Sequence, residues 1–233
     1  MAERILLITG TSRGLGRAMA EHFLAAGDTV IGCSRSASDL EHRHYQHHCL
    51  DISDETAVST LLRDLRRAQP RLDALINNAG MASMNAFALS PIESFDNICA
   101  ANVRGTVLFC QKALPLLRRA EAARIINFST IAVPMNLAGE SLYAASKSAV
   151  ETLTRVIAKE YGAYGITCNA IGPSPIDTAL IRGVGKEKIE TLLKQQAINT
   201  MATADDVINI ADFFLRPESR LVTGQVLYLG GLG

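Results

Sequence analysis

The glycine-rich loop after the first apolar segment most constrains the fold of this chain. Residues 5–8 are a short apolar run, and residues 9–16 read Thr-Gly-Thr-Ser-Arg-Gly-Leu-Gly before a helical pattern begins. Glycines let the backbone approach a pyrophosphate, whose charge then lies at the helix N-terminus. The stretch therefore predicts the strand, turn and helix that open a dinucleotide-binding unit. The residues expected to contact the cofactor here are Gly10, Thr11, Ser12, Arg13, Gly14, Leu15 and Gly16.

Strand-like and helix-like patterns alternate along the rest of the chain. The expected strands after residues 5–8 are 29–33, a third that closes at 50–52, 73–76, 124–128, 166–171 and 225–229. The expected helices are 14–27, one that begins after Ser53, 90–119, 142–161, 186–197 and 203–215. This alternation predicts an α/β fold, a Rossmann-type doubly wound parallel sheet of about seven strands with helices on both faces. With no linker or repeat, residues 1–233 form a single expected domain.

Three helix starts carry capping signals. Ser53 precedes two acidic residues, whose charge suits the positive end of a helix. Ser90 precedes Pro91 and Glu93, the order of a capped helix with proline in its first turn. Thr203 is expected to cap the last helix. Within the helix over 90–119, Pro115 is expected to cause a kink.

Charge and cysteine content limit the classes of partner. Lysine plus arginine and aspartate plus glutamate each total 23, so the formal net charge is zero. Nothing in this balance favours a nucleic acid or an acidic membrane surface as partner. No apolar segment has the length of a membrane span, and no signal peptide is recognisable. The five cysteines are scattered without a Cys-x-x-Cys pair, which is typical of a reduced, cytoplasmic protein.

The end of the second strand predicts the type of nucleotide. An acidic residue at this point would bind the 2′-hydroxyl of an NAD ribose, but Ser34 and Arg35 occupy it. Arg35 and Arg13 suit a 2′-phosphate, because guanidinium groups bind phosphate through paired, charge-assisted hydrogen bonds. We therefore expect NADPH; the alternative is that both arginines are ordinary surface residues. Asp51 and Ile52 are expected beside the adenine.

Four histidines lie between residues 41 and 49, just before the end of the expected third strand. His42 and His44 have a spacing that could bind a metal, but no cysteine or carboxylate cluster completes a tetrahedral set. We expect a loop that leads into the strand and no metal site. The remaining two, His47 and His48, are assigned no function by the sequence.

Tyr143 and Lys147 form the reactive pair predicted from the sequence. They are four residues apart in a helical segment, so their side chains share one face. A free phenol has a pKa of about 10, and a nearby ammonium favours the phenolate and lowers that pKa. Tyr143 is thus expected to exchange a proton with a developing alkoxide. The alternative is an exposed pair without a function.

Together these motifs resemble the short-chain dehydrogenase/reductase family over residues 5–231. The shared motifs are the glycine-rich loop at 9–16, Asn-Asn-Ala-Gly at 77–80, Asn102 and Tyr-x-x-x-Lys at 143–147. The resemblance implies that Tyr143 is the catalytic acid/base and that Lys147 also binds the nicotinamide ribose. It implies that Asn102 holds a water of the proton relay. It also implies a turn beside the cofactor formed by Asn78, Ala79 and Gly80.

Three positions depart from the family pattern. The serine that binds the substrate carbonyl is replaced by Thr130, with its neighbour Ser129 as the second choice. The usual Pro-Gly after the sixth strand reads Pro173-Ser174. The C-terminal segment reads Leu-Gly-Gly without the usual aspartate. In the family, the residues that contact the nicotinamide carboxamide correspond here to Ile176 and Thr178.

Substrate choice is assigned to a lid at about 179–200. The chain is most similar to 3-oxoacyl-[acyl-carrier-protein] reductases, which implies an acyl thioester substrate. Arg118, Arg119 and Arg124 are candidates to meet an acidic carrier protein; the alternative is that basic residues at a helix end complement the helix dipole. Two alternatives remain: a reductase of a free small carbonyl compound, and an NADPH-binding partner subunit without turnover. The family also implies a homotetramer or homodimer joined through the helices at 90–119 and 142–161.

Overall fold

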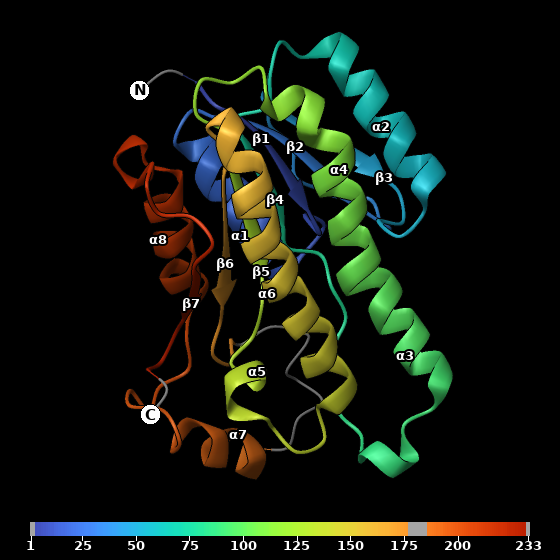
Figure 1. Ribbon diagram of the computed structural model, residues 1–233, viewed down its shortest axis with the longest axis vertical. Helices are drawn as coiled ribbons and strands as arrows, with labels where there is room; N and C mark the ends of the chain where they lie inside the picture. The colour runs from blue at the N-terminus through green and yellow to red at the C-terminus, as the bar shows by residue number, and fades with distance from the viewer. Residues whose placement is uncertain (1–2, 177–185, 232–233) are drawn as a thin grey trace.

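The computed structural model describes residues 3–176 and 186–231, which form one seven-stranded parallel sheet with helices on both faces (Figure 1). The strands are β1 (Ile5–Thr9), β2 (Thr29–Ser34), β3 (Tyr45–Cys49), β4 (Ala74–Asn77), β5 (Arg124–Phe128), β6 (Thr167–Gly172) and β7 (Val226–Tyr228). Their order in the sheet is β3-β2-β1-β4-β5-β6-β7. The predicted doubly wound parallel sheet is therefore confirmed.

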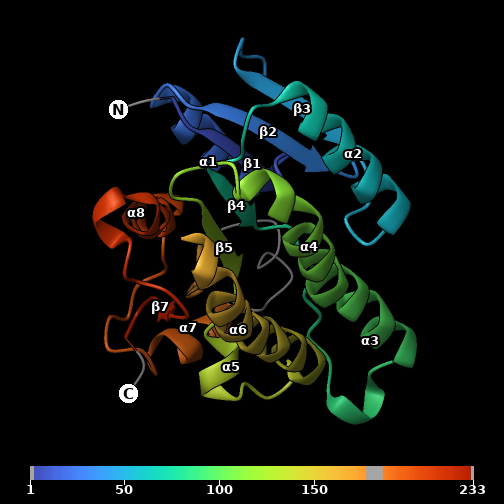
Figure 2. The ribbon, with the colours of Figure 1, turned by 45° about the horizontal axis from the view of Figure 1, so that its top comes forward.

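Helices connect the strands, and alternate residues of each strand pack against opposite helical layers. The α-helices are α1 (Gly14–Ala25), α2 (Glu55–Ala68), α3 (Ile92–Ile98), α4 (Gly105–Leu117), α5 (Ala132–Met135), α6 (Ser141–Tyr161), α7 (Lys186–Leu193) and α8 (Ala204–Leu215). The short helices are η1 (Phe87–Leu89), η2 (Cys99–Arg104), η3 (Gly162–Tyr164) and η4 (Pro217–Ser219). Figure 2 shows α8 and α4 on opposite sides of the strands.

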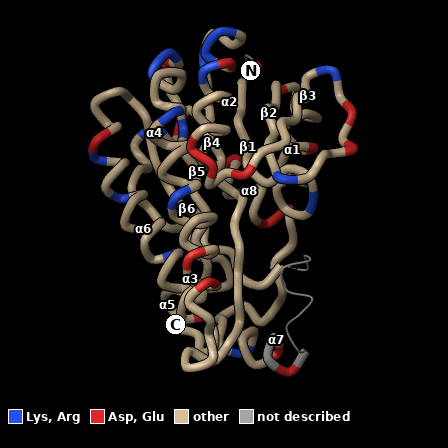
Figure 3. The backbone as a smooth tube through the Cα atoms, turned by 90° about the vertical axis from the view of Figure 1, so that its right-hand side faces the viewer, with Lys and Arg blue, Asp and Glu red and all other residues tan. Residues whose placement is uncertain are grey.

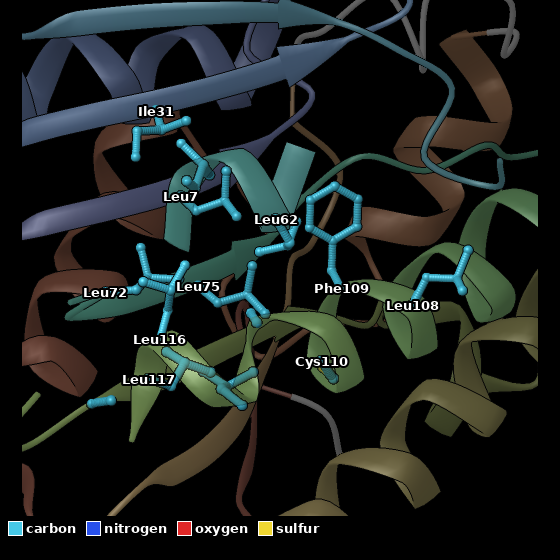
Figure 4. Close-up of a cluster of buried hydrophobic side chains, with 14 of the residues drawn as sticks. Leu7, Ile31, Leu62, Leu72, Leu75, Leu108, Phe109, Cys110, Leu116 and Leu117 are labelled. Atoms are coloured by element: carbon cyan, nitrogen blue, oxygen red, sulfur yellow. The ribbon is translucent and has the colours of Figure 1, made fainter. Parts of the chain in front are cut away.

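Two apolar clusters result from this alternation. In β1, Ile5 and Leu7 join a cluster with residues of α2, α4 and α6, whereas Leu6 and Ile8 join a cluster with α1 and α8. Figure 4 shows the first cluster, in which Phe109 of α4 packs among leucines of the sheet and of α2. Burying each such side chain contributes about 1.5–3 kcal/mol. Both faces of the sheet are thereby fixed to its helices.

Two predicted element ends were wrong. The third strand ends at Cys49 rather than at 50–52, because the chain turns at Asp51, whose carboxylate accepts from the Ser53 amide at 2.8 Å. Ser53 is not the cap of α2, because its amide and hydroxyl both donate to the Asp51 carboxylate. Asp54 caps it, accepting from two backbone amides of the first turn. The last helix begins at the predicted position, where Thr203 forms a capping box with Asp206.

The helix expected over 90–119 is divided into three parts. Ser90 does not cap it, since its hydroxyl donates to the Ala86 carbonyl oxygen at 3.2 Å and Pro91 occupies the cap position. Between α3 and α4, η2 has π-helical hydrogen bonding and contains Asn102. Pro115 lies near the end of α4. A π-helical segment inside a helix often marks a functional site.

The glycine-rich loop follows β1, at the point in the sheet where successive connections begin to run in opposite directions. β1 lies between β2 and β4, so the connections that leave β1 and β4 diverge and open a crevice at their carboxyl ends. Ligands of open α/β sheets bind in such crevices. The loop after β1 and the Asn-Asn-Ala-Gly turn after β4 both lie there.

Charged residues of both signs are interspersed along the chain (Figure 3), in keeping with its zero net charge. Within the described residues, no helix is both long and apolar enough to cross a membrane. The cysteines are all free thiols; Cys33, Cys110 and Cys168 are buried, whereas Cys49 is exposed.

Candidate active site and nucleotide cleft

A cleft of about 1780 Å³ runs along the carboxyl ends of the strands, from the glycine-rich loop to α7. Most of the predicted site residues line it. They are Gly10, Ser12, Arg13, Gly14, Leu15, Gly16, Ser34, Arg35, Asp51, Ile52, Asn78, Ala79, Gly80, Thr130, Tyr143, Lys147, Pro173 and Ile176. Thr178 and residues 179–185 of the expected lid lie outside the described part of the chain.

Close packing requires two of the glycines in the loop. A Cβ atom on Gly16 would overlap the Gly10 carbonyl oxygen, and one on Gly10 would lie 2.8 Å from the Asn78 amide nitrogen. Gly10 also has a φ of 82°, in the left-handed region. Arg13 occupies the N-cap position of α1, but its side chain forms no hydrogen bond to the first backbone amides of the helix. The first residues of α1 line the cleft. These amides and the helix dipole favour an anion.

The Asn-Asn-Ala-Gly turn holds the two central strands together. The Asn78 amide donates to the Thr9 carbonyl oxygen at 2.9 Å, and the Ala79 backbone amide donates to the Thr9 hydroxyl at 2.9 Å. The polar side chain of Asn78 is thereby occupied within the protein. The turn lines the cleft, and its contact with a cofactor stays a prediction.

Two arginines are available at the ribose end of the cleft. Arg13 and Arg35 line it and, in the described ranges 3–176 and 186–231, neither forms an ion pair. Arg17, by contrast, binds Glu21 at 2.7 Å and also Asp39. Unpaired guanidinium groups beside the loop suit an additional phosphate.

Asp51 lies at the same end of the cleft. Hydrogen bonds from the Ser53 amide and hydroxyl, together with the charge of Arg35, hold the pKa of Asp51 below its ordinary value. A carboxylate at this position therefore stays ionised at neutral pH.

The predicted contact between Thr11 and the cofactor is not supported by the position of its side chain. Its side chain is fully buried and does not line the cleft. The Thr11 hydroxyl instead accepts from the Tyr45 hydroxyl at 2.9 Å and lies 3.3 Å from Nδ1 of His47. Sequence reasoning missed this cluster, because no spacing within the chain brings a loop residue and the third strand together.

Tyr143 and Lys147 share one face of α6 at the centre of the cleft, with Nζ of Lys147 6.0 Å from the Tyr143 ring centroid. Burial lowers the pKa of Lys147 to about 8 and raises the pKa of Tyr143 to about 12. The Thr130 hydroxyl opposes the rise for Tyr143, and the charge of Glu140 adds to it. The expected lowering of the phenol pKa by the ammonium is thus wrong for the chain alone, because desolvation outweighs it.

Thr130 and Ser129 diverge at the end of β5. The Ser129 hydroxyl donates to the buried carboxylate of Glu151 at 2.6 Å, and Tyr228 of β7 donates to the same oxygen. Ser129 therefore connects the sheet to α6. Both residues line the cleft, but of the two hydroxyls only that of Thr130 acts on the pKa of Tyr143.

Asn102 lies behind the cleft wall rather than in it. Its side chain is fully buried; its amide nitrogen donates to the Met81 carbonyl oxygen and the Ser146 hydroxyl, each at 2.9 Å. Its amide oxygen accepts from the Met81 backbone amide at 2.8 Å. A Cβ atom on Gly80 would lie 2.9 Å from that oxygen and 3.4 Å from Nζ of Lys147, so both residues converge beneath Gly80. The relay water implied for Asn102 stays a prediction.

The substrate end of the cleft contains a carboxylate that sequence reasoning missed. Glu140 occupies the N-cap position of α6 without capping it, and it lines the cleft three residues before Tyr143. Within the described residues no ion pair joins it to a cation. Burial raises the pKa of Glu140 above its ordinary value. Its place three residues before Tyr143, at the start of the expected helix, was the available signal.

Apolar side chains also line the cleft at this end. Leu137 comes from the segment before α6, and Ile189 and Leu192 come from α7, part of the expected lid. Ser174, which replaces the usual glycine, is buried and lines the cleft as well.

The three arginines expected to meet a carrier protein lie away from the cleft. Arg124 is 3% exposed and begins β5, at the end of the strand opposite the cleft. The Arg118 guanidinium stacks 4.3 Å from the Tyr164 ring centroid, and Arg119 donates to the Arg66 carbonyl oxygen at 3.3 Å. None of the three lines the cleft. Their contact with a carrier protein stays a prediction.

The histidine-rich segment does not assemble a metal centre within residues 3–176 and 186–231. No group of three or more histidine, cysteine, aspartate or glutamate side chains is placed there to hold an ion. The histidines instead lie along and before β3.

Comparison with known proteins gives matches over nearly the whole chain. A family described as enoyl-(acyl carrier protein) reductase matches residues 10–231. The 2-(R)-hydroxypropyl-CoM dehydrogenase of Xanthobacter autotrophicus is 32% identical, over 98% of this chain and 97% of that protein. The 3-oxoacyl-[acyl-carrier-protein] reductase FabG of Escherichia coli is 27% identical, over 98% and 96%.

A solved structure shows the same architecture. The aldohexose dehydrogenase of Thermoplasma acidophilum superimposes with a TM-score of 0.90 at 28% identity, covering 99% of this chain and 94% of that one. All three named proteins are oxidoreductases, and their names give three different substrates.

Proposed function

Because the chain belongs to the short-chain dehydrogenase/reductase family of oxidoreductases, we propose that it reduces a carbonyl to an alcohol with NADPH. The observation that carries the proposal is the convergence of Tyr143, Lys147 and Thr130 on the cleft that the glycine-rich loop opens. The same residues serve the reverse oxidation of an alcohol.

The cleft fits a phosphorylated dinucleotide. The close-packed glycines leave room for a pyrophosphate at the N-terminus of α1, and Arg13 and Arg35 would hold a 2′-phosphate. Lys147 would bind the nicotinamide ribose, and Ile176 and Thr178 the carboxamide. When bound, NADPH would supply the hydride.

The chain's own residues would supply the proton. The Thr130 hydroxyl would donate to the substrate carbonyl oxygen and orient it. Tyr143 would transfer its phenolic proton to that oxygen as the carbonyl carbon accepts the hydride. With a pKa of about 12 in the chain alone, Tyr143 is protonated at neutral pH and ready to act as an acid. The charge of Lys147 would stabilise the phenolate left behind.

A 3-oxoacyl thioester, carried by coenzyme A or an acyl carrier protein, is the first candidate substrate. The similarity to FabG supports it, as do the apolar side chains of Leu137, Ile189 and Leu192, which suit an acyl chain. α7, in the described part of the expected lid, would then lie against that chain.

A free small carbonyl compound is the second candidate, and Glu140 favours it. A carboxylate beside Tyr143 has no partner in a simple 3-oxoacyl group, whereas a hydroxyl or ammonium near the carbonyl would donate to it. Substituting Glu140→Gln keeps the shape and removes the charge. For a substrate with such a donor we expect about a tenfold loss in kcat/KM. No loss would exclude Glu140 from substrate binding.

We further propose a homo-oligomer joined through the α3–α4 and α6 surfaces. Phe87, Leu89 and Ile92 are 73%, 78% and 76% exposed at the η1–α3 end, an apolar surface that a second copy would cover. Sedimentation at several protein concentrations tests this: a dimer or tetramer supports it, and a monomer throughout contradicts it.

The function is tested by NADPH consumption with acetoacetyl-CoA, a short 3-oxoacyl carrier protein and a panel of free aldehydes, ketones and hydroxyketones, each repeated with NADH. Turnover with NADPH and thioesters supports the first candidate. Turnover only with free carbonyls supports the second. NADPH binding without any turnover would support the partner-subunit alternative and contradict the enzyme proposal.

A further inference from the structure

We propose that His47 is a positioning residue that sets the preference for NADPH over NADH by joining the two loops that carry Arg13 and Arg35. This proposal rests on the NADPH-dependent function above. His47 belongs to the histidine-rich segment for which the sequence offered no role.

One ring nitrogen of His47 holds the loop after β2. Its Nε2 lies 3.0 Å from the Ser36 carbonyl oxygen and 3.1 Å from the Ser34 hydroxyl, which itself donates to that carbonyl at 2.7 Å. A carbonyl oxygen only accepts, so Nε2 carries the proton. Arg35 lies between these two serines, and His47 therefore fixes the backbone on both sides of it.

The other ring nitrogen holds the glycine-rich loop. Nδ1 lies 2.8 Å from the Tyr45 hydroxyl and 3.3 Å from the Thr11 hydroxyl, and these hydroxyls are hydrogen-bonded to one another at 2.9 Å. With its proton on Nε2, a neutral ring would accept here from one of these two hydroxyls. Thr11 lies two residues before Arg13.

The cluster of Thr11, Tyr45 and His47 requires a glycine at position 32. Gly32 of β2 lies beneath it, and a Cβ atom there would overlap both the Thr11 and the Tyr45 hydroxyls. The other histidines of the segment take no part in it. His44, for example, precedes β3, and its Nδ1 lies 3.6 Å from Oε1 of Glu3.

The consequence concerns the 2′-phosphate. Both arginines are long, exposed side chains without ion-pair partners in the described ranges, and a phosphate must engage both at once. Holding their backbones at a set separation lowers the entropy that binding must overcome. NADH has no 2′-phosphate and does not need the two arginines together. Loss of His47 should therefore weaken the phosphorylated nucleotide selectively.

The test is calorimetric binding of 2′,5′-ADP and 5′-AMP to the full chain carrying His47→Leu, with KM measured for NADPH and NADH. We expect binding of 2′,5′-ADP to weaken about tenfold, in parallel with KM for NADPH, while 5′-AMP, NADH and kcat stay nearly unchanged. His44→Leu is the matched control and should change none of these. His47→Gln and His47→Asn each keep one of the two contacts, so their affinities should lie between those of His47→Leu and the original chain.

Each other outcome has a distinct meaning. Unchanged 2′,5′-ADP binding by His47→Leu, or equal weakening of both nucleotides, would overturn the role of His47 in selectivity. If His47→Leu does not fold, as judged by thermal unfolding, the Gln and Asn variants decide the question in the same way. If the unaltered chain binds both nucleotides equally, the NADPH proposal itself fails, whatever the variants do.

Discussion

The ammonium of Lys147 donates a hydrogen bond to the carbonyl oxygen of Phe128 at 2.8 Å. This contact joins the middle of α6 to the end of β5, two residues before Thr130. The two elements that carry the proposed proton donor and the proposed carbonyl ligand are thus held together by Lys147. Fixing such groups by their neighbours is what gives a site its precision.

Replacing Tyr143 with phenylalanine should abolish most turnover. The ring would still fill its place on α6, but no phenolic proton would be available, and positioned acids contribute about 10²–10⁴-fold to rate. NADPH binding, measured by fluorescence, should change little. Activity that survives the substitution would show that another group is the proton donor.

Alanine substitution should lower activity at Thr130 but stability at Ser129. Thr130→Ala removes a hydroxyl that faces the cleft, so kcat/KM should fall by about 10²-fold with little change in stability. Ser129→Ala removes a donor to the buried Glu151, which should cost about 1–3 kcal/mol in urea unfolding and leave the chemistry nearly intact. The reverse pattern would make Ser129 the ligand of the carbonyl.

Cofactor affinity should depend on the charge of Lys147. Because burial lowers its pKa to about 8, the ammonium loses its proton as pH rises through that value. NADPH is anionic, so its dissociation constant should increase above about pH 8. Lys147→Arg keeps the charge, and its affinity should stay level over the same range. A flat profile for the unaltered chain would contradict a role for this charge in binding.

The same pKa shift predicts a stability effect of defined sign. Between about pH 8 and the ordinary value of 10.5, the unfolded chain keeps the Lys147 proton that the folded chain has lost. Burying the charged Lys147 therefore lowers stability below about pH 8, and this penalty decreases as pH rises through the window. In urea unfolding, the original chain should gain free energy of unfolding relative to Lys147→Met over that range.

The cysteines should react in an order that their burial sets. Burial raises the pKa of Cys33 and of Cys110 to about 12, so neither forms the reactive thiolate at pH 8. Cys49 is exposed on β3 and should be alkylated first by iodoacetamide. Mass spectrometry of the folded and the urea-unfolded chain measures this order. Early labelling of Cys110 in the folded chain would mean that α4 opens locally.

Local patterns along the chain determined most of the architecture. The apolar run at 5–8, the glycines at 10 and 16 and the Tyr-x-x-x-Lys spacing each depend on backbone geometry over a few residues, so the order of strands and helices and the face of α6 could be predicted. Errors at Ser53 and Ser90 were also local, because neighbouring residues compete for the same cap.

Contacts between distant segments were decided only by the tertiary structure. Packing of the sheet with its loops and helices brings Thr11 next to Tyr45 and His47, buries Arg124 at the end of β5 opposite the cleft and pairs Ser129 with Glu151. It also buries Tyr143 deeply enough that desolvation, not the nearby ammonium, governs its pKa. Hydrogen bonding and desolvation depend on which atoms lie within a few ångströms in space, and separation along the chain does not encode that distance.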